Sequence, residues 1–202
     1  MEGYVDLVAV PRGSVRFPLE LEPPAGFRPE DPATWPRVPG RLEWVGGKLW
    51  FMPPCGSKQM YVATDSTLVL GNWAADRPEF IVGSNEAGMH LGGDVRGAEG
   101  AVWRREDLGG PAGGFEHVVP ILAVEVTGQE EDAEALRQKA AWYLGRGVAN
   151  VWIVLCDSGE VLAMTREGER RYGRGERIAE HPALPGLCPL VDRFFETLDR
   201  RQ

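Results

Sequence analysis

The stretch from Val118 to Cys156 constrains the fold more than any other part of the chain. It contains two nearly continuous apolar runs rich in β-branched residues, 118–127 and 151–156. Such runs are typical of strands that are covered on both faces of a sheet. Between them, acidic residues, an apolar stripe at helical spacing and two terminal glycines predict a helix over 132–144. This order predicts two parallel, neighbouring, central strands in an α/β fold.

Glu125 interrupts the first of these two strands. A buried carboxylate is costly unless it is paired or holds a metal ion. On this residue alone, an ion pair with an arginine or a place near a strand end explains the pattern as well as a functional site does. Lys139 favours a site, because it lies at helical spacing from Leu136 and Tyr143 of the apolar stripe. A carboxylate on a strand and a lysine on the packed helix can then meet.

Length and charge limit the class of protein. A chain of 202 residues is long enough for one domain with a sizeable core. The net charge of −8 argues against a protein that coats nucleic acid through its overall electrostatic field. It does not exclude a local basic patch. Five arginines lie between residues 166 and 177, where a solvated loop is a simpler interpretation than a grip on phosphate.

The three cysteines are far apart in the chain and form no CxxC motif: Cys55, Cys156 and Cys188. This usage favours a reducing compartment and argues against a disulfide framework or a zinc site. The start of the chain lacks the basic and apolar regions of a signal peptide. No apolar run approaches the roughly 20 residues of a membrane span. We therefore expect a soluble, cytoplasmic protein.

The remaining chain divides into an arm and a domain. Residues 1–40 are rich in proline and predict an N-terminal extended arm, with a short strand at 4–10. A Gly46-Gly47 turn predicts a hairpin over 41–52. Ser57 can cap a helix over 58–74. Further short elements are expected as strands at 80–82, 89–91, 101–103 and 161–165, and as a terminal amphipathic helix with Phe194, Phe195 and Leu198.

A metal-dependent hydrolysis of phosphodiesters would use several of these residues together. The reaction needs carboxylates that converge on a divalent ion, and it benefits from a lysine that stabilises charge or orients water. Glu125 and Lys139 are two candidates. The acid on the preceding strand is either Glu99 or Asp94, which lies in the turn before it. Because acidic residues are common, the spacing alone leaves both open.

The order of several short motifs is more specific than any one of them. The motifs are Arg41-Leu42-Glu43 with Gly47-Lys48-Leu49 and Met52-Pro53-Pro54, Gly93-Asp94-Val95-Arg96 with Ala98-Glu99, Pro120 to Glu125-Val126, Lys139 with Tyr143, Gly147-Val148 with Val151-Trp152-Ile153-Val154, and Leu184-Pro185-Gly186-Leu187. In this order they resemble the Uma-type putative restriction endonucleases, a bacterial family of the PD-(D/E)XK nuclease superfamily. The resemblance covers roughly residue 30 to the end.

The resemblance implies a fold and a site. The fold is a restriction-endonuclease-like core over 41–202, a mixed central sheet flanked by helices. The site holds Mg²⁺ or Mn²⁺ on Glu99 and Glu125, with Lys139 as the catalytic lysine and Glu43 as an additional acidic residue. The implied function is a metal-dependent endonuclease that hydrolyses DNA. Because two strands need two sites and aromatic residues are frequent near the hairpins and tail, we also expect a homodimer.

Several positions differ from the family pattern. Ala98-Glu99 stands where the family has Pro-Asp, and Gln59 stands where many relatives have His. Thr127 and Gly128 replace a leucine and a serine. These differences keep a second hypothesis open, a catalytically degenerate nuclease fold that acts as a binding module. A third and weaker hypothesis is an α/β enzyme that acts on a small molecule. It is weaker because the chain lacks a glycine-rich phosphate-binding loop and a nucleophile elbow.

These hypotheses give a geometric expectation. The carboxylates of Glu99 and Glu125 should converge in a cleft, because two close carboxylates repel each other unless a cation lies between them. The ammonium of Lys139 should lie within a few ångströms of them, and Glu43 should lie at the rim.

Overall fold

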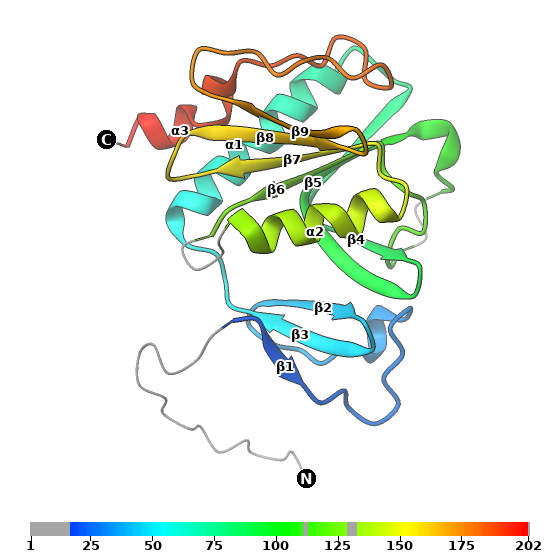
Figure 1. Cartoon of the computed structure of the whole chain (residues 1–202). Coiled ribbons are helices and arrows are strands. Elements are labelled where there is room, and N and C mark those ends of the chain that lie inside the picture. The colour runs from blue at the N-terminus through cyan, green and yellow to red at the C-terminus, as the bar shows by residue number, and fades with distance from the viewer. Residues whose placement is uncertain (1–16, 111–112, 129–132, 202) are drawn as a thin grey trace.

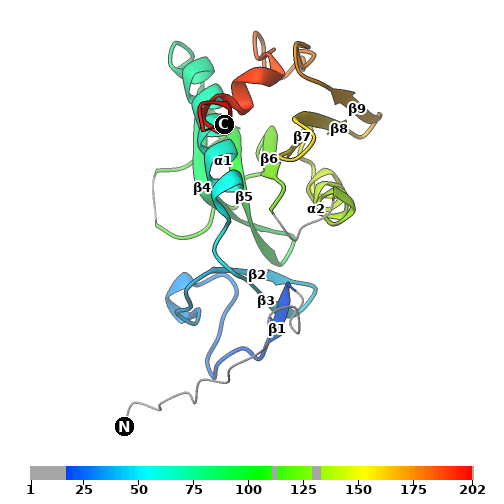
Figure 2. The same ribbon diagram turned by 90° about the vertical axis from the view of Figure 1, so that its left-hand side faces the viewer.

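The computed structural model describes residues 17–110, 113–128 and 133–201. Within these ranges one mixed sheet of nine strands is covered by α1 on one face and α2 on the other (Figure 1 and Figure 2). The strands are β1 (Leu19–Leu21), β2 (Arg41–Val45), β3 (Lys48–Met52), β4 (Phe80–Leu91), β5 (Asp94–Arg104), β6 (Leu122–Val126), β7 (Asn150–Leu155), β8 (Glu160–Thr165) and β9 (Gly168–Tyr172). The helices are α1 (Ser57–Ala74), α2 (Ala133–Gly145) and α3 (Glu196–Asp199), with 3₁₀ turns η1 (Pro32–Thr34), η2 (Arg105–Asp107) and η3 (Val191–Phe194).

The centre of the sheet follows the prediction. The strand order is β1-β3-β2-β5-β6-β7-β8-β9, and β4 pairs with β5. β6 and β7 are parallel neighbours, in register from Leu122↔Asn150 to Val126↔Val154. Every residue of both strands is buried. The mixed α/β fold class and the two central strands are therefore confirmed. The expected first residue of the crossover helix, Asp132, lies outside the described residues.

Two apolar cores form because both faces of the central strands are covered. On one face, Val62, Leu70 and Trp73 of α1 pack with the C-terminal Phe194 and Phe195 against the sheet. On the other face, the predicted stripe of α2 packs on alternate residues of the same strands, through Leu136, Ala140 and Tyr143. Because side chains alternate along a strand, neighbouring residues of β6 serve different cores.

Strand β4 differs from the two short strands that were expected. It runs without a break from Phe80 to Leu91, and its register against β5 shifts between Ser84 and Ala87. Asn85 and Glu86 at this bulge both have φ of 57°. The polar residues at the bulge interrupt the apolar alternation, and this interruption led to the expectation of two separate strands. In the structure, β5 pairs with β4 on both sides of the bulge, so β4 is one strand.

Two smaller expectations also need correction. The stretch 166–177 is a loop only in part, because Gly168–Tyr172 within it forms strand β9, antiparallel to β8. Arg171 of this strand pairs with Glu160 of β8 at 2.9 Å, and Arg170 lies over the ring of Tyr172. Ser57 is the first residue of α1 and not its cap, which is Gly56.

The N-terminal part of the described chain packs beside the hairpin β2–β3. Strand β1 pairs with β3, and the ring of Phe27 lies 5.1 Å from that of Trp44. The expected strand at 4–10 lies outside the described residues. β2 reaches the main sheet through the pair Trp44↔Val95, so β1–β3 form a lobe beside the larger body (Figure 1). In the ranges described above, the helices are too short or too polar to cross a membrane.

Candidate active site

A cluster of charged side chains is buried where β2, β5, β6 and α2 meet. The ammonium of Lys139 lies 2.9 Å from Glu125 Oε2 and 3.0 Å from Glu43 Oε1. It also donates to the carbonyl of Gly97 at 2.7 Å. Arg96 Nε lies 2.9 Å from Glu43 Oε2. Glu43, Glu125 and Lys139 are only 2%, 2% and 4% exposed.

The local folding explains why Glu125 meets Lys139. Val124 and Val126 face the α1 core, so Glu125 between them faces α2. Lys139 lies on the buried side of α2 together with Tyr143. The hydroxyl of Tyr143 donates to Glu125 Oε1 at 2.9 Å. Both oxygens of Glu125 are therefore bonded to α2.

The two acids of this cluster have pKa values shifted in opposite directions. Burial raises the pKa of Glu43, but the positive charges of Lys139 and Arg96 outweigh burial and bring it to about 2. For Glu125, burial prevails over Lys139 and raises the pKa. Burial and the charge of Glu125 raise the pKa of Tyr143 well above its ordinary value, so the phenol keeps its proton.

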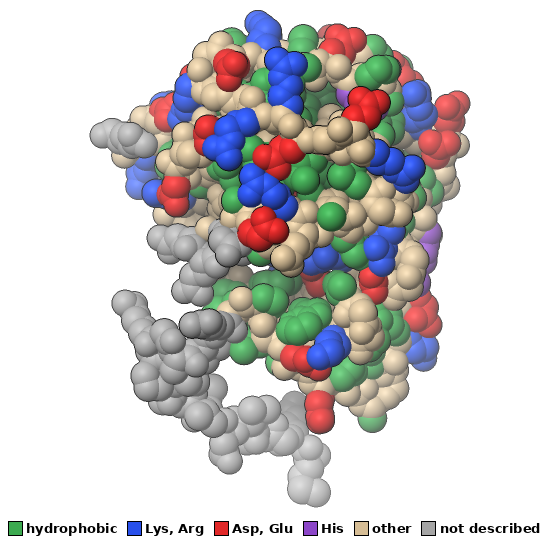
Figure 3. Space-filling view, viewed as in Figure 1, with side chains coloured by type: hydrophobic (Ala, Val, Ile, Leu, Met, Phe, Trp, Pro, Cys, Tyr) green, Lys and Arg blue, Asp and Glu red, His purple; other side chains and the backbone are tan. Residues whose placement is uncertain are grey.

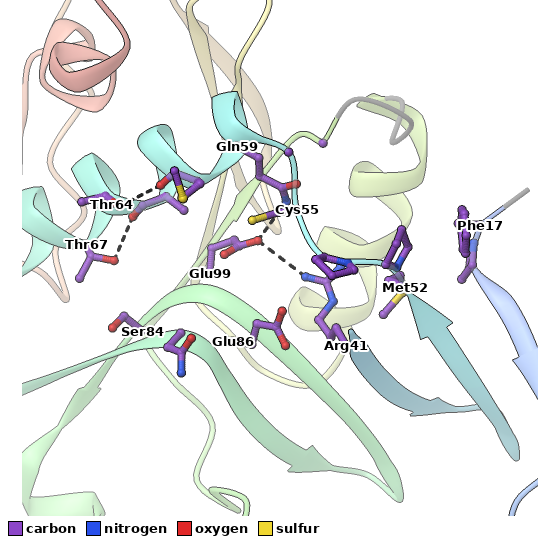
Figure 4. A pocket seen from close by; sticks show the side chains of 18 of the residues that line it. Phe17, Arg41, Met52, Cys55, Gln59, Thr64, Thr67, Ser84, Glu86 and Glu99 are labelled. Atoms are coloured by element: carbon purple, nitrogen blue, oxygen red, sulfur yellow. Dashed lines mark hydrogen bonds and ion pairs between the residues drawn. The ribbon is translucent and has the colours of Figure 1, made fainter. Parts of the chain in front are cut away.

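Glu99 faces the opposite side, toward α1 (Figure 4). The amide of Gln59 donates to Glu99 Oε1 at 3.1 Å and to the carbonyl of Val126 at 3.2 Å. Arg41 Nη1 lies 3.7 Å from Glu99 Oε1. Burial and the charge of Glu125 raise the pKa of Glu99 to about 7. The negative charge of Glu125 therefore acts on the pKa of Glu99, but the hydrogen bond that Glu99 accepts comes from Gln59 and not from Lys139.

A cavity of about 640 Å³ opens beside Glu99, between the end of the hairpin, α1 and the bulge of β4 (Figure 4). Its lining includes Arg41, Gln59, Met60, Leu68, Glu86 and Glu99. Glu125, Lys139 and Glu43 are buried and are not among the residues that line this pocket.

The expected site residues are thus bonded to different helices, Glu99 to α1 and Glu125 to α2. Direct contacts join Glu43, Glu125 and Lys139, whereas Glu99 bonds to Gln59 on α1. Glu43 lies in the middle of the buried cluster and not at its rim, because two cations offset its burial. Asp94 lies elsewhere.

Asp94 belongs to a separate network. It accepts hydrogen bonds from Trp142 Nε1 at 2.7 Å and from the backbone N–H of Gly46 at 2.9 Å. It also pairs with Arg146. These contacts leave Glu99 as the acid of β5 beside the pocket.

Some residues of the site were not singled out from the sequence. Arg96 and Gly97 supply a cation and a carbonyl to the buried cluster, and Arg41 and Glu86 line the pocket. Arg96 and Arg41 stand within motifs that carried the family resemblance, so their place in those motifs was a usable signal. Glu86 had a weaker one, the polar interruption of β4.

The donor atoms fit a divalent cation in kind. In the described part of the chain no three His, Cys, Asp or Glu side chains are grouped to hold a metal ion. Mg²⁺, however, is commonly held by one or two carboxylates, with water and substrate phosphate as its other ligands. Burial, and after it the charge of Glu125, raise the pKa of Glu99, and a cation would stabilise the ionised form of this carboxylate. Glu99 and Glu125 are the residues that would hold it.

The mixed sheet has a buried carboxylate on a central strand, in contact with a lysine of the next helix, as the resemblance to the nuclease family implied. Residues 29–192 match the model of the Uma2 family, described as putative restriction endonucleases, and the chain belongs to this family.

A solved structure shows the same fold. The crystal structure of a putative nuclease belonging to DUF820 from Anabaena variabilis superposes with a TM-score of 0.72. It is 13% identical in sequence, and the match covers 82% of this chain and 96% of that one. No curated protein matches this chain.

Proposed function

We propose that this protein is an endonuclease that hydrolyses DNA phosphodiester bonds with Mg²⁺ or Mn²⁺. Membership of the Uma2 family supports a nuclease. The observation that carries the proposal is the buried contact of Glu125 with Lys139, next to Glu99 in an open pocket. A divalent ion held by Glu99 and Glu125 would polarise the phosphate and supply a nucleophilic water at neutral pH.

Glu99 is suited to exchange a proton for a cation. Its pKa of about 7 means that the carboxyl group is partly protonated near neutral pH. A bound cation would favour the ionised form of Glu99, which would then release this proton to solvent. Arg41, at 3.7 Å, supplies a fixed positive charge on the same side of the pocket.

Lys139 holds Glu125 in place. Its ammonium has three N–H donors, and Glu43, Glu125 and Gly97 supply one acceptor each. Lys139 therefore contacts a substrate oxygen only if it releases one of these acceptors. The proposed catalytic role of Glu43 is to position Lys139, with Arg96 keeping Glu43 ionised.

The test combines cleavage with metal binding. Wild type, Glu99→Gln and Glu125→Gln would be incubated with supercoiled plasmid and Mn²⁺, Mg²⁺ or EDTA, and titrated with Mn²⁺ by calorimetry. We expect metal-dependent nicking and Mn²⁺ binding by the wild type, and loss of both in the two variants. Glu20→Gln is the control, because the Glu20 side chain is half exposed and pairs with Lys48 instead of with the buried cluster. Unchanged cleavage by Glu125→Gln would contradict the proposal.

A second candidate is a binding module without catalysis. It is favoured by the way protein donors already bond the candidate ligand atoms: Gln59 bonds Glu99 and Val126, and Lys139 bonds Glu125. This candidate predicts no Mn²⁺ heat and no nicking, with DNA binding that EDTA does not change. The homodimer stays a proposal, and a monomer mass by light scattering at micromolar concentration would exclude it.

A further inference from the structure

The pocket beside Glu99 has an exposed apolar wall. Met60 and Leu68 of α1 are 46% and 53% exposed and both line it. Over the described residues, Val119 at 37% is the other large hydrophobic side chain exposed to this degree. Exposed apolar side chains that gather at a concave site indicate a ligand or a partner.

This wall is a second stripe of α1. The buried stripe, with Val62 and Leu70, packs into the core. Met60 and Leu68 lie two turns apart on another side of the helix, with Thr64 between them. The hydroxyl of Thr64 bonds back to the carbonyl of Met60, so the stripe offers an apolar surface with little free polarity (Figure 4).

The charges of the pocket suit a base better than a phosphate backbone. Of its lining side chains, Arg41 is a cation, whereas Glu86 and Glu99 are acids. The whole chain carries −8. On the face shown in Figure 3, Lys and Arg are interspersed with Asp and Glu. Binding through DNA phosphates needs several cations, so most of the binding energy in this pocket must come from apolar contact.

The opposite wall carries groups that can bond a polar edge. Ser84, Asn85 and Glu86 of the β4 bulge line the pocket. Two successive non-glycine residues with φ of 57° are strained, and such strain concentrates at binding sites. Gly97 allows the bulge to come close, because a Cβ there would lie 3.1 Å from Glu86 Cβ.

We propose that this pocket receives an unpaired nucleobase, from a single strand or a locally opened duplex, and so places the adjoining phosphodiester at Glu99. The inference rests on the proposed nuclease function. In a duplex the faces of a base are stacked and unavailable, whereas an unpaired base offers an apolar face and a polar edge. The volume of about 640 Å³ lies within the range of about 300–1,000 Å³ usual for small-ligand sites.

The test measures binding of labelled oligonucleotides by fluorescence anisotropy in EDTA, where no metal-dependent cleavage interferes. The probes are a single strand, its duplex, and the same strand with abasic sites. We expect the single strand to bind roughly tenfold more tightly than the duplex or the abasic strand. In Met60→Ser/Leu68→Ser, single-strand affinity should fall by roughly fivefold or more, with duplex affinity unchanged. Val119→Ser, exposed but outside the pocket, is the matched control.

Equal affinity for single strand, abasic strand and duplex would overturn the inference. So would a Met60→Ser/Leu68→Ser variant that binds like Val119→Ser. If the wild type still nicks plasmid with Mn²⁺ in either case, the proposed function stands and the base pocket alone falls. If the wild type neither binds nor cuts any of the DNA probes, both fall together.

Discussion

Glu43 and Glu99 are two nearly buried carboxylates that the structure treats in opposite ways. Their side chains are 3% and 12% exposed, yet the pKa of Glu43 is about 2 and that of Glu99 about 7. Glu43 contacts two cations at 2.9 and 3.0 Å. Glu99 has an amide and one guanidinium 3.7 Å away. Burial is similar, so the difference comes from the two cations that contact Glu43 and from the negative charge of Glu125 near Glu99.

This comparison separates a closed side of the site from an open one. On the closed side, the charges of two acids and two cations balance through direct ion pairs: Glu43, Glu125, Lys139 and Arg96. On the open side, Glu99 lies beside a cavity, and burial and the charge of Glu125 disfavour its ionised form. An external cation or a proton can therefore act at Glu99, while the closed side keeps Glu125 in position.

The largest effect should come from removing the cation of the closed side. Lys139→Met leaves the carboxylates of Glu43 and Glu125 buried without their shared partner. Breaking a buried ion pair from one side costs about 3–5 kcal/mol of unfolding free energy. Lys48→Met is the control: Lys48 and Glu20 are about half exposed, and such a surface pair is worth about 0–1 kcal/mol. Urea unfolding at neutral pH measures both, and equal losses would refute a special closed side.

On the open side, we expect a substitution to stabilise the metal-free protein. The pKa of Glu99 rises from 4.5 to about 7 on folding, so the folded state keeps a proton that the unfolded state releases. Below pH 4.5 the carboxyl group is protonated in both states, so its raised pKa does not change the free energy of unfolding. As the pH rises from about 4.5 to about 7, the unfolded state loses the proton first and the free energy of unfolding falls. Glu99→Gln removes this loss and should add about 3 kcal/mol above pH 7, with no gain near pH 4.5.

Unfolding in urea with EDTA, as a function of pH, measures this gain. Mn²⁺ should reduce the difference between wild type and Glu99→Gln, because a bound cation stabilises the ionised carboxylate. A gain that is the same at all pH values would show that Glu99 does not titrate as proposed.

The closed side was largely accessible from the sequence, because it depends on local patterns. One acid inside an apolar strand and one lysine beside an apolar helical stripe predicted that Glu125 and Lys139 meet, and they do. The central parallel pair followed from the same periodicity. The family resemblance pointed to Glu43, but its burial depends on Arg96, a cation from another strand.

The open side could not be predicted in the same way. Glu99 is the β5 residue opposite the β4 bulge, where the register shifts between Ser84↔Gly100 and Ala87↔Ala98, and periodicity alone does not show where its side chain points. No local pattern shows that Gln59 would bond both Glu99 and Val126, residues 40 and 67 positions away. Long-range pairing of this kind is set by tertiary packing and not by periodicity.

A smaller effect is expected from Tyr143→Phe. This change removes the hydroxyl that donates to Glu125 Oε1 at 2.9 Å and keeps the ring in the core. A hydrogen bond to a charged group contributes about 2 kcal/mol, so we expect a loss of that size in unfolding free energy. Tyr61→Phe on α1, half-buried and away from the cluster, should change stability by much less. Equal losses in the two variants would show that Glu125 does not need this donor.

The smallest expected effect tests the comparison itself, by a double-mutant cycle above pH 7. Gln59→Met removes the donor to Glu99, and Glu99→Gln removes the charge that this donor stabilises. Because they share one hydrogen bond, their effects on unfolding free energy should deviate from additivity by about 1 kcal/mol. Gln59→Met with Tyr143→Phe joins residues from opposite faces of the sheet and should be additive within about 0.5 kcal/mol. If the second pair were coupled as strongly as the first, Glu99 and Glu125 would belong to one network. The division into a closed and an open side would then be wrong.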